Sequence, residues 1–504
     1  MNQKCRLIKA NEKWKFKAKE RSIDNCELRK KIKRLEEQVI IEKLNHDVAI
    51  ELLKDEIKKT LILSSTDNEA GIATKQKLRV LCVRLLTVGV VSFRAVPRIL
   101  KIIGDSIKYI NHVPPHFTSV INWALRAGIG VFKNVSPVCE PWIAIIDMSN
   151  TIGTRKILVV KRVLLSCLSK KGKAIALEDS ECIGIDSRDV WNGNTVKEAL
   201  DKFFLNAGMP AAILKDAGSD LKKGVRLFCE QNQSKNIIVI DDIGHVAALI
   251  LKNEFEKNPD FVKFIELVTT GSKKIRQTIV AWAMSPRLRD KGRFQGITKL
   301  ANWAKDILAI LDGNDSGISP DEMAIIKKTF SGLAELRLFI DRFVTTCELV
   351  EQLLALMKNK GLNKKTAKEG INILSKLPKD SQVKQRLLSW ISKHLQSQQQ
   401  LRRDCRTLLV SSDTIESLFG KFKSIIERSP KPELNKLIYI IPLLCGKIND
   451  EKISHALLKC SHVEMLEFIS KNIPITIRQQ RFKLLKKSKK LVPNLRNFTT
   501  EKTA

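Results

Sequence analysis

The feature of this sequence that most constrains its fold is a change of pattern at Pro141. From there three segments rich in Ile, Val and Leu follow one another closely: WIAIIDM, KILVVKRVLL and KAIALEDSECIGID. Short apolar runs bounded by turn residues predict consecutive β-strands. The pattern then predicts a helix, a strand, a helix, a strand and a helix, at residues 195–207, AAIL, 221–231, NIIVI and 243–257. This order predicts an α/β domain with a mixed five-stranded sheet and helices on both faces.

The residues before the predicted sheet are expected to be helical. Residues 1–63 predict a basic helical region in which four residues have coiled-coil spacing over about two heptads: Leu28, Ile32, Leu35 and Val39. A dimer contact and a solvated charged helix explain this spacing equally well.

Residues 72–135 predict three short helices with tight turns, the last ending at Gly128. A helix-turn-helix module and an ordinary small helical bundle both fit this pattern. In a helix-turn-helix the last helix would enter the DNA major groove. Its outer face would then carry Ser119, Asn122 and Arg126.

The charge of the chain favours a polyanionic partner. Its 504 residues include 89 Lys and Arg against 54 Asp and Glu, a formal charge of +35. Nucleic acid is the first candidate, because each phosphate that a cation neutralises also releases condensed counterions. We expect no membrane span, because no apolar run is long enough to cross a bilayer. The scattered cysteines form no CxxC pair, which argues against a disulfide framework or a zinc finger. No phosphate-binding glycine motif predicts a nucleotide cofactor, and no apolar leader is present, so a cytoplasmic, nucleoid-associated protein is expected.

Two aspartates are placed to bind metal ions. Asp147 lies inside the most apolar predicted strand, where a carboxylate is costly unless it is paired or bound to a metal. Asp216 follows the AAIL strand directly. If the first and fourth strands are neighbours, these two carboxylates can approach each other. Cleavage of a phosphodiester by two Mg²⁺ ions about 3.5–4 Å apart needs carboxylates that converge in this way.

The segment ILKDAGSDLKKG resembles the strand-end signature of retroviral integrases and DDE transposases, an Asp followed by x-Gly and a polar pair. The order of the predicted elements is likewise that of the ribonuclease-H-like fold. The resemblance implies that Asp216 is the second catalytic acid after Asp147, with Asp220 a weaker candidate. One departure from many relatives is Lys215, a long cation where they have a smaller residue.

The fragment SSDTIESLFGKFK resembles the terminal Glu motif of transposases with a helical insertion, including the hAT superfamily. It implies that Glu416 is the third acid, whereas Glu427 on the same predicted helix lacks the motif. Phe419 would then pack inward, and Lys421 and Lys423 would be available to phosphate.

The segment DDIGH resembles the C/D-x-x-H signature of several insertion-bearing transposases. The match makes Asp242 and His245 part of the active-site surroundings, without making them primary metal ligands. A helix cap beside a hydrogen-bonded core histidine is the competing interpretation.

An all-helical insertion at residues 259–406 would explain the long separation between the second and third acids. The first half of the insertion is basic, and Trp303 lies just beyond the cationic cluster, where an indole can stack on an unpaired base. A core position on an amphipathic helix explains Trp303 equally well. Trp282, inside the cluster, is more simply interpreted as a core residue. The predicted domains are residues 1–63, 72–135, 138–258, 259–406, 407–475 and a basic tail at 476–504.

These features predict a DDE transposase that uses two Mg²⁺ ions, with Mn²⁺ able to substitute, to cleave and transfer DNA strands. The expected partners are the DNA of the element ends and of the target, and a second copy of the chain. Two alternatives remain open: a transposase-derived DNA-binding protein that no longer cuts, and a ribonuclease-H-fold nuclease without strand transfer. A coiled-coil interaction protein is harder to reconcile with a buried Asp147.

Overall fold

The computed structural model describes residues 68–106, 113–152, 155–167, 174–286, 294, 296–313, 317–400, 407–426, 436–473, 480–482 and 484–485. The predicted coiled coil, Glu427 and nearly all of the basic tail lie outside these residues. Two compact units are present, one formed by Val80–Val96 with Phe117–Ala504 and the other by Met1–Arg79 with Pro97–His116. The candidate site lies entirely within the first unit.

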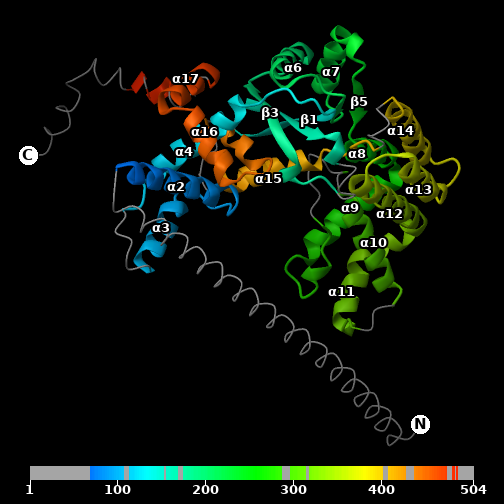
Figure 1. Ribbon diagram of the computed structural model, residues 1–504. Helices are drawn as coiled ribbons and strands as arrows, with labels where there is room; N and C mark the ends of the chain where they lie inside the picture. The colour runs from blue at the N-terminus through cyan, green and yellow to red at the C-terminus, as the bar shows by residue number, and fades with distance from the viewer. Residues whose placement is uncertain are drawn as a thin grey trace, which may run out of the picture. The chain divides into compact units, whose positions relative to one another are not determined.

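A mixed five-stranded sheet with the order β3-β2-β1-β4-β5 forms the centre of this unit (Figure 1). Its strands are β1 (Trp142–Ile152), β2 (Arg155–Leu164), β3 (Ser180–Arg188), β4 (Ala212–Lys215) and β5 (Ile238–Asp241). The first three pair antiparallel, whereas β4 is parallel to both β1 and β5. The predicted mixed five-stranded sheet is therefore confirmed, and its order is consistent with a ribonuclease-H-like plan.

The third strand is shorter than the sequence pattern predicts. The LED of KAIALED forms a short 3-10 helix, η1 (Leu177–Asp179), and the strand begins only at Ser180. The Asp179 carboxylate accepts the backbone N–H of Ala176, which closes a local turn in place of a strand ladder.

Alternate side chains along β1 and β2 project to opposite faces of the sheet. One face carries Trp142, Ala144 and Ile146 from β1, with Leu158 and Val160 from β2. Two helices, α6 (Gly193–Ala207) and α7 (Ser219–Gln231), pack on this face through apolar residues that include Phe203, Phe204 and Phe228 (Figure 1). A short 3-10 helix, η2 (Gln233–Lys235), follows α7.

The opposite face of the sheet presents Ile145 and Asp147 from β1 and Lys161 from β2. The helix α15 (Asp413–Ile426) contacts β1, and the 3-10 segment η5 (Lys436–Leu444) contacts β3 and α15. This face therefore carries both a predicted catalytic strand residue and the helix that bears Glu416.

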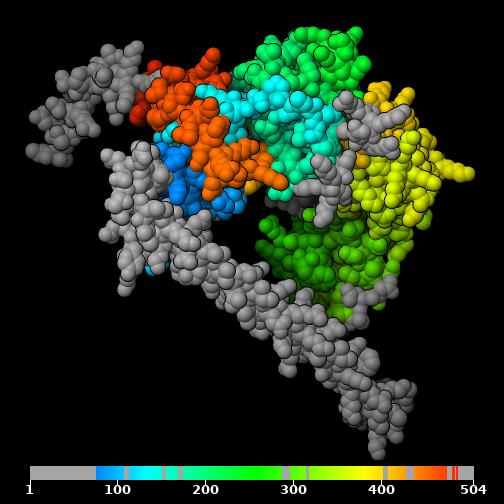
Figure 2. Space-filling model, viewed as in Figure 1, coloured from blue at the N-terminus to red at the C-terminus, as the bar shows by residue number. Residues whose placement is uncertain are grey.

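The described residues between β5 and α15 form helices. They are α8 (Ile243–Phe255), α9 (Pro259–Ile275), η3 (Ala281–Ala283), α10 (Thr298–Leu311), α11 (Pro320–Phe330), η4 (Ser331–Leu336), α12 (Arg337–Lys360), α13 (Lys364–Ser375) and α14 (Gln382–Gln398). Phenylalanine rings from α8, α9 and the η4–α12 segment form their core: Phe255, Phe261, Phe264, Phe339 and Phe343. Within the described part of this segment, the extended pairing is a single bridge from Leu362 to Leu408, which is not part of the sheet. The surface of these helices is coloured green to yellow in Figure 2.

The remaining helices are α2 (Asn68–Thr87), α3 (Ala95–Ser106), α4 (Phe117–Lys133), α16 (Asp450–Lys459) and α17 (His462–Asn472). Contrary to prediction, α4 continues past Gly128. A Cβ there would collide with the backbone of Tyr439, and one at Gly130 with that of Ala456, so both glycines allow α4 to lie directly against η5 and α16. None of the described helices is both long enough and apolar enough to span a membrane.

Candidate active site

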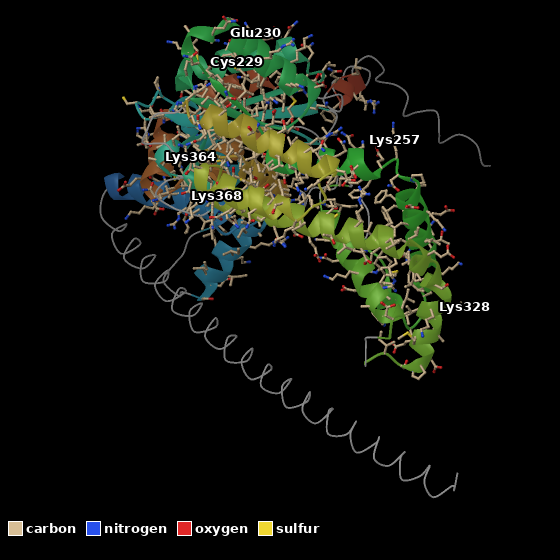
Figure 3. All side chains as sticks on the ribbon, turned by 90° about the vertical axis from the view of Figure 1, so that its right-hand side faces the viewer. Cys229, Glu230, Lys257, Lys328, Lys364 and Lys368 are labelled. Atoms are coloured by element: carbon tan, nitrogen blue, oxygen red, sulfur yellow. The ribbon has the colours of Figure 1, made fainter. Side chains whose placement is uncertain are left out.

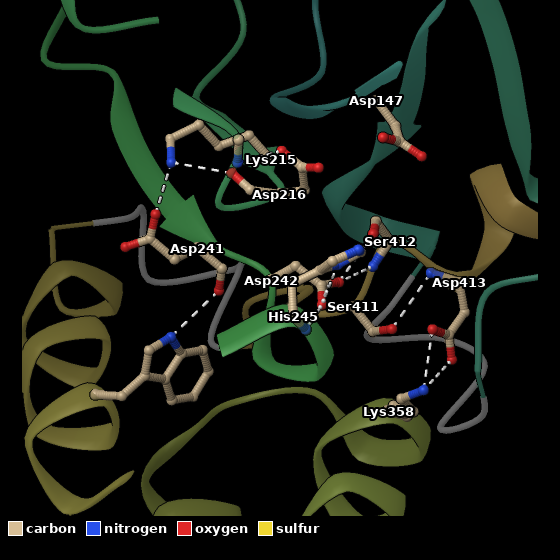
Figure 4. Close-up of polar contacts among 12 residues, drawn as sticks. Asp147, Lys215, Asp216, Asp241, Asp242, His245, Lys358, Ser411, Ser412 and Asp413 are labelled. Atoms are coloured by element: carbon tan, nitrogen blue, oxygen red, sulfur yellow. Dashed lines mark hydrogen bonds and ion pairs between the residues drawn. The ribbon is translucent and has the colours of Figure 1, made fainter. Parts of the chain in front are cut away.

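Asp147 and Asp216 come from neighbouring parallel strands. The register that pairs Ile145 with Leu214 and Ile146 with Lys215 leads directly to these two aspartates. Asp147 is partly exposed within β1, and its Oδ1 accepts the backbone N–H of Met148 at 2.6 Å. Figure 4 shows Asp147 on β1 and Asp216 just after the end of β4. The predicted approach of the first two acids is therefore present in the structure.

The turn after β4 holds the Asp216 side chain. Its Oδ1 accepts the backbone N–H of Gly218 at 2.7 Å. A Cβ at Gly218 would lie only 2.9 Å from that same oxygen, so a larger residue would push the carboxylate away. The lack of a side chain at Gly218 thus gives a steric reason for the glycine of the motif. Asp220 lies two residues after Gly218, in the first turn of α7, where a carboxylate stabilises the helix N-terminus.

Lys215 turns away from the carboxylate of Asp216. Its side chain is buried, and its Nζ forms an ion pair with Asp241 at 2.7 Å. Asp241 also pairs with Lys393 of α14 at 3.1 Å, and its backbone carbonyl accepts the Trp390 indole N–H at 3.2 Å. The unusual cation therefore ties the end of β4 to β5 and α14. Sequence analysis missed this role because the partners lie far apart along the chain.

The start of α15 is joined to the start of α8 by Asp242. This carboxylate is 2% exposed, and its Oδ2 accepts both the backbone N–H of Ser412 at 2.5 Å and its hydroxyl at 2.9 Å. Its Oδ1 accepts the backbone N–H of His245 at 2.8 Å and lies 3.2 Å from the imidazole Nδ1 (Figure 4). Asp242 therefore caps α8 and also anchors the segment leading into the Glu416 helix.

The pKa of Asp147 is raised to about 7, mostly by burial of its carboxylate and further by the negative charge of Asp216. The hydrogen bond from Met148 and the nearby His245 oppose this increase, whereas Glu416 adds to it. Asp147 is therefore close enough to Asp216, His245 and Glu416 to respond to their charges.

Glu416 lies in the first turn of α15 and is exposed to solvent. Partial desolvation raises its pKa, and the carboxylates of Asp413 and Asp242 raise it further, against the effects of His245 and Lys358. The predicted inward packing of Phe419 is confirmed, since its side chain is buried.

The donor chemistry around Asp147 fits a hard divalent cation. Partial desolvation and the nearby charge of Asp216 put the Asp147 carboxylate in an unfavourable setting that a bound cation would relieve. In the described part of the chain, however, no group of three or more His, Cys, Asp or Glu side chains is close enough to hold one metal ion. Glu416 is thus within electrostatic reach of Asp147 without converging with both aspartates on one point.

Several predicted DNA contacts occupy other environments. Arg126 donates from Nε to the carbonyl oxygen of Cys460 and from a terminal nitrogen to that of Leu457, both at 2.8 Å. It therefore caps the end of α16, and we no longer assign it to DNA. Ser119 and Asn122 are partly exposed on α4, but the packing of that helix against η5 and α16 removes much of the free surface a recognition helix needs.

The two lysines after Glu416 differ in setting. Lys421 is half-buried, and burial lowers its pKa, with Cys445 acting in the opposite direction. Lys423 is partly exposed in the last turn of α15.

The environments of the two tryptophans differ. Trp303 donates its indole N–H to the carbonyl of Ala283 at 2.9 Å and packs edge-on against Phe330, with ring centroids 5.5 Å apart. Trp282 is 54% exposed, so its interpretation as a core residue is wrong. Their hydrophobicity alone could not distinguish them, because the difference lies in which other helices reach each side chain.

No protein-family model matches the sequence. No curated protein matches it either. Among solved structures, the chain is similar to one described as the Drosophila P element transposase strand transfer complex, with a TM-score of 0.40 and 12% identity over 82% of this chain and 99% of that chain. At these values the likeness is distant.

Proposed function

We propose that this protein is a DDE-type DNA transposase that cleaves and joins DNA strands with the help of two divalent metal ions. The observation that supports the proposal is that Asp147 and Asp216 come from neighbouring parallel strands and that Glu416 of α15 is close enough for its charge to act on Asp147. A formal charge of +35 supports a nucleic acid as the partner.

In this proposal Asp147 contributes to both metal positions, Asp216 completes one and Glu416 the other. Mg²⁺ bound there would polarise the phosphodiester and activate the attacking oxygen, first of water and then of a freed 3′-OH. Glu416 would have to move closer to the two aspartates when metal and DNA bind.

The residues around the acids have separate tasks. Asp242 and Ser412 hold the segment that leads into the Glu416 helix. The pKa of His245 is raised to about 9, chiefly by its hydrogen bond to Asp242, so the imidazole is positively charged at neutral pH. A cation beside three acids offsets part of their repulsion and can attract a DNA phosphate.

The test is cleavage of duplex DNA that contains the sequences flanking the gene, with and without Mg²⁺. We expect Asp147→Ala, Asp216→Ala and Glu416→Ala each to abolish cleavage and to leave DNA binding within roughly twofold, because phosphate contacts supply most of the affinity. Asp220→Ala is the matched control and should retain cleavage, since Asp220 serves the first turn of α7.

A wild-type protein that binds this DNA but never cuts it would favour the non-cutting alternative. Cleavage without strand joining would favour a simple nuclease. Full activity of Glu416→Ala combined with loss in Glu427→Ala would show that the third acid is wrongly assigned.

A further inference from the structure

Lys161 is a fully buried cation in the middle of β2, with 0% of its surface exposed. Its Nζ donates a hydrogen bond to the backbone carbonyl oxygen of Thr414 at 3.1 Å. Burial lowers the pKa of this ammonium, with the nearby Cys445 and Cys182 opposing the change. A buried lysine is costly, because the loss of hydration is only partly compensated by such a contact. The presence of a lysine at this position is therefore not explained by a contribution to the stability of the fold.

The position of Lys161 relates it directly to the predicted catalytic acids. Lys161 pairs with Ile145 on β1, and Val159 pairs with Asp147. Residues two apart in a strand face the same way, so Lys161 and Asp147 project from the same face of the sheet. Its acceptor, Thr414, lies in the first turn of α15, two residues before Glu416.

Three elements hold three consecutive residues at the start of α15. Asp242 of α8 accepts hydrogen bonds from Ser412, and Lys358 of α12 pairs with Asp413 at 2.7 Å. Lys161 of β2 holds Thr414 from the sheet side. Figure 4 shows the first two of these contacts. Of these three contacts, the one from Lys161 comes from a strand of the central sheet.

We propose that Lys161 is a positioning residue that holds the first turn of α15 against the sheet face bearing Asp147, and so sets the place of Glu416. The inference rests on the proposed function for its effect on cleavage. Its structural part, that Lys161 orders the start of α15, does not depend on any activity.

The decisive variant is Lys161→Met, which keeps the length of the side chain and removes the charge and the hydrogen bond. Removing a buried charge should leave the melting temperature equal or higher. DNA binding should be unchanged, whereas the cleavage rate at saturating DNA should fall roughly 10–100-fold, the scale of loss caused by a misplacement of about 1 Å. A lysine with a merely structural role would lower stability and activity together.

Hydrogen exchange supplies a readout that needs no activity. In Lys161→Met the backbone amides of the first turns of α15 should exchange roughly tenfold faster or more, while those of β1 and β2 keep their protection.

Arg162, the next residue on β2, gives the matched control. It faces the other side of the sheet, pairs with Glu181 and donates to the carbonyls of Ser136 and Ala207. Arg162→Met should lower the melting temperature. Measured well below that temperature, it should leave both the exchange of α15 and the cleavage rate per folded molecule unchanged.

Wild-type exchange at α15 in Lys161→Met would overturn the inference, as would wild-type cleavage in an active protein. If the wild-type protein does not cleave DNA, the proposed function fails, and the exchange experiment still decides the role of Lys161. Lys161→Leu is the second variant should Lys161→Met not fold. Failure of both to fold would also overturn the inference, because Lys161 would then be needed for the fold itself.

Discussion

The hydrogen-bonded side chains of His245 and Asp242 make the charge at the candidate site depend on pH. The pKa of His245 is raised to about 9, mostly by its hydrogen bond to Asp242 and also by the charges of Asp216 and Asp147, whereas burial opposes the increase. Burial alone raises the pKa of Asp242, but its hydrogen bonds to His245 and Ser412 lower it below the ordinary value of 3.8. Both members of the pair are therefore charged at neutral pH.

A pH dependence of stability follows from these two shifts. Because the folded pKa of His245 exceeds its ordinary value of 6.5, its contribution is complete below pH 6.5 and is lost as the pH rises through about 9. The contribution of Asp242 is present above pH 3.8 and is lost as the pH falls below that value. His245→Gln should remove the alkaline loss, on the order of 1–2 kcal/mol after allowance for solvent screening.

The stability of metal-free wild type and His245→Gln is measured by thermal unfolding at evenly spaced pH values from about 6 to 10. Wild type and His245→Gln should differ most near neutral pH and converge at the alkaline end. Parallel curves across that range would show that folding does not raise the pKa of His245.

At the level of secondary-structure elements, η3 and the end of α9 form an exposed surface with both cations and an aromatic ring. Lys273, Lys274 and Arg276 are exposed, and Trp282 follows in η3. The indole N–H of Trp282 lies 3.4 Å from Glu322, a long contact at the surface that leaves the ring 54% exposed. Trp303, by contrast, supports the packing of α10.

We predict opposite effects for these two tryptophans. Trp282→Ala should keep the wild-type melting temperature and weaken binding of single-stranded DNA by about 1–3 kcal/mol, the contribution of one base stacked on an aromatic ring. Trp303→Ala should lower stability by about 2–4 kcal/mol, because it removes a packed ring and a hydrogen bond. Calorimetry measures the effect of each substitution on stability, and a fluorescence titration measures its effect on the affinity for single-stranded DNA. Unchanged affinity in Trp282→Ala would exclude the stacking role.

At the level of the whole molecule, the excess of cations should dominate DNA binding. Lysines are exposed on several elements of the helical segment, among them Lys257, Lys328, Lys364 and Lys368 (Figure 3). If the protein neutralises about 6–10 phosphates, its affinity for duplex DNA should fall roughly 10³–10⁵-fold between about 50 and 200 mM salt.

A titration of labelled duplex DNA at four salt concentrations measures this slope. The slope should be the same for unrelated sequences, since phosphate contacts carry no sequence information. Affinity that does not change with salt would contradict a phosphate-based interface and would leave the large charge unexplained.

The strands, and the placement of Asp147 and Asp216 on neighbouring strands, could be predicted from sequence because the sequence patterns that indicate them are local. The apolar runs around Asp147 and before Asp216 identify β1 and β4 without knowledge of any partner, and the strand order then makes these aspartates neighbours. In α12, Ile340, Phe343 and Cys347 follow one another at helical spacing, which is also a local pattern, and all three are buried.

Only the tertiary structure decided what the long and amphipathic side chains do. Arg126 donates a hydrogen bond to Cys460, Lys215 forms an ion pair with Asp241, and Lys161 donates a hydrogen bond to Thr414. These partners lie far apart in sequence, so no local pattern relates them. A strand or a helix face is determined by the spacing of neighbouring residues, whereas the partner of a lysine, an arginine or a tryptophan is determined by which distant segment packs against it.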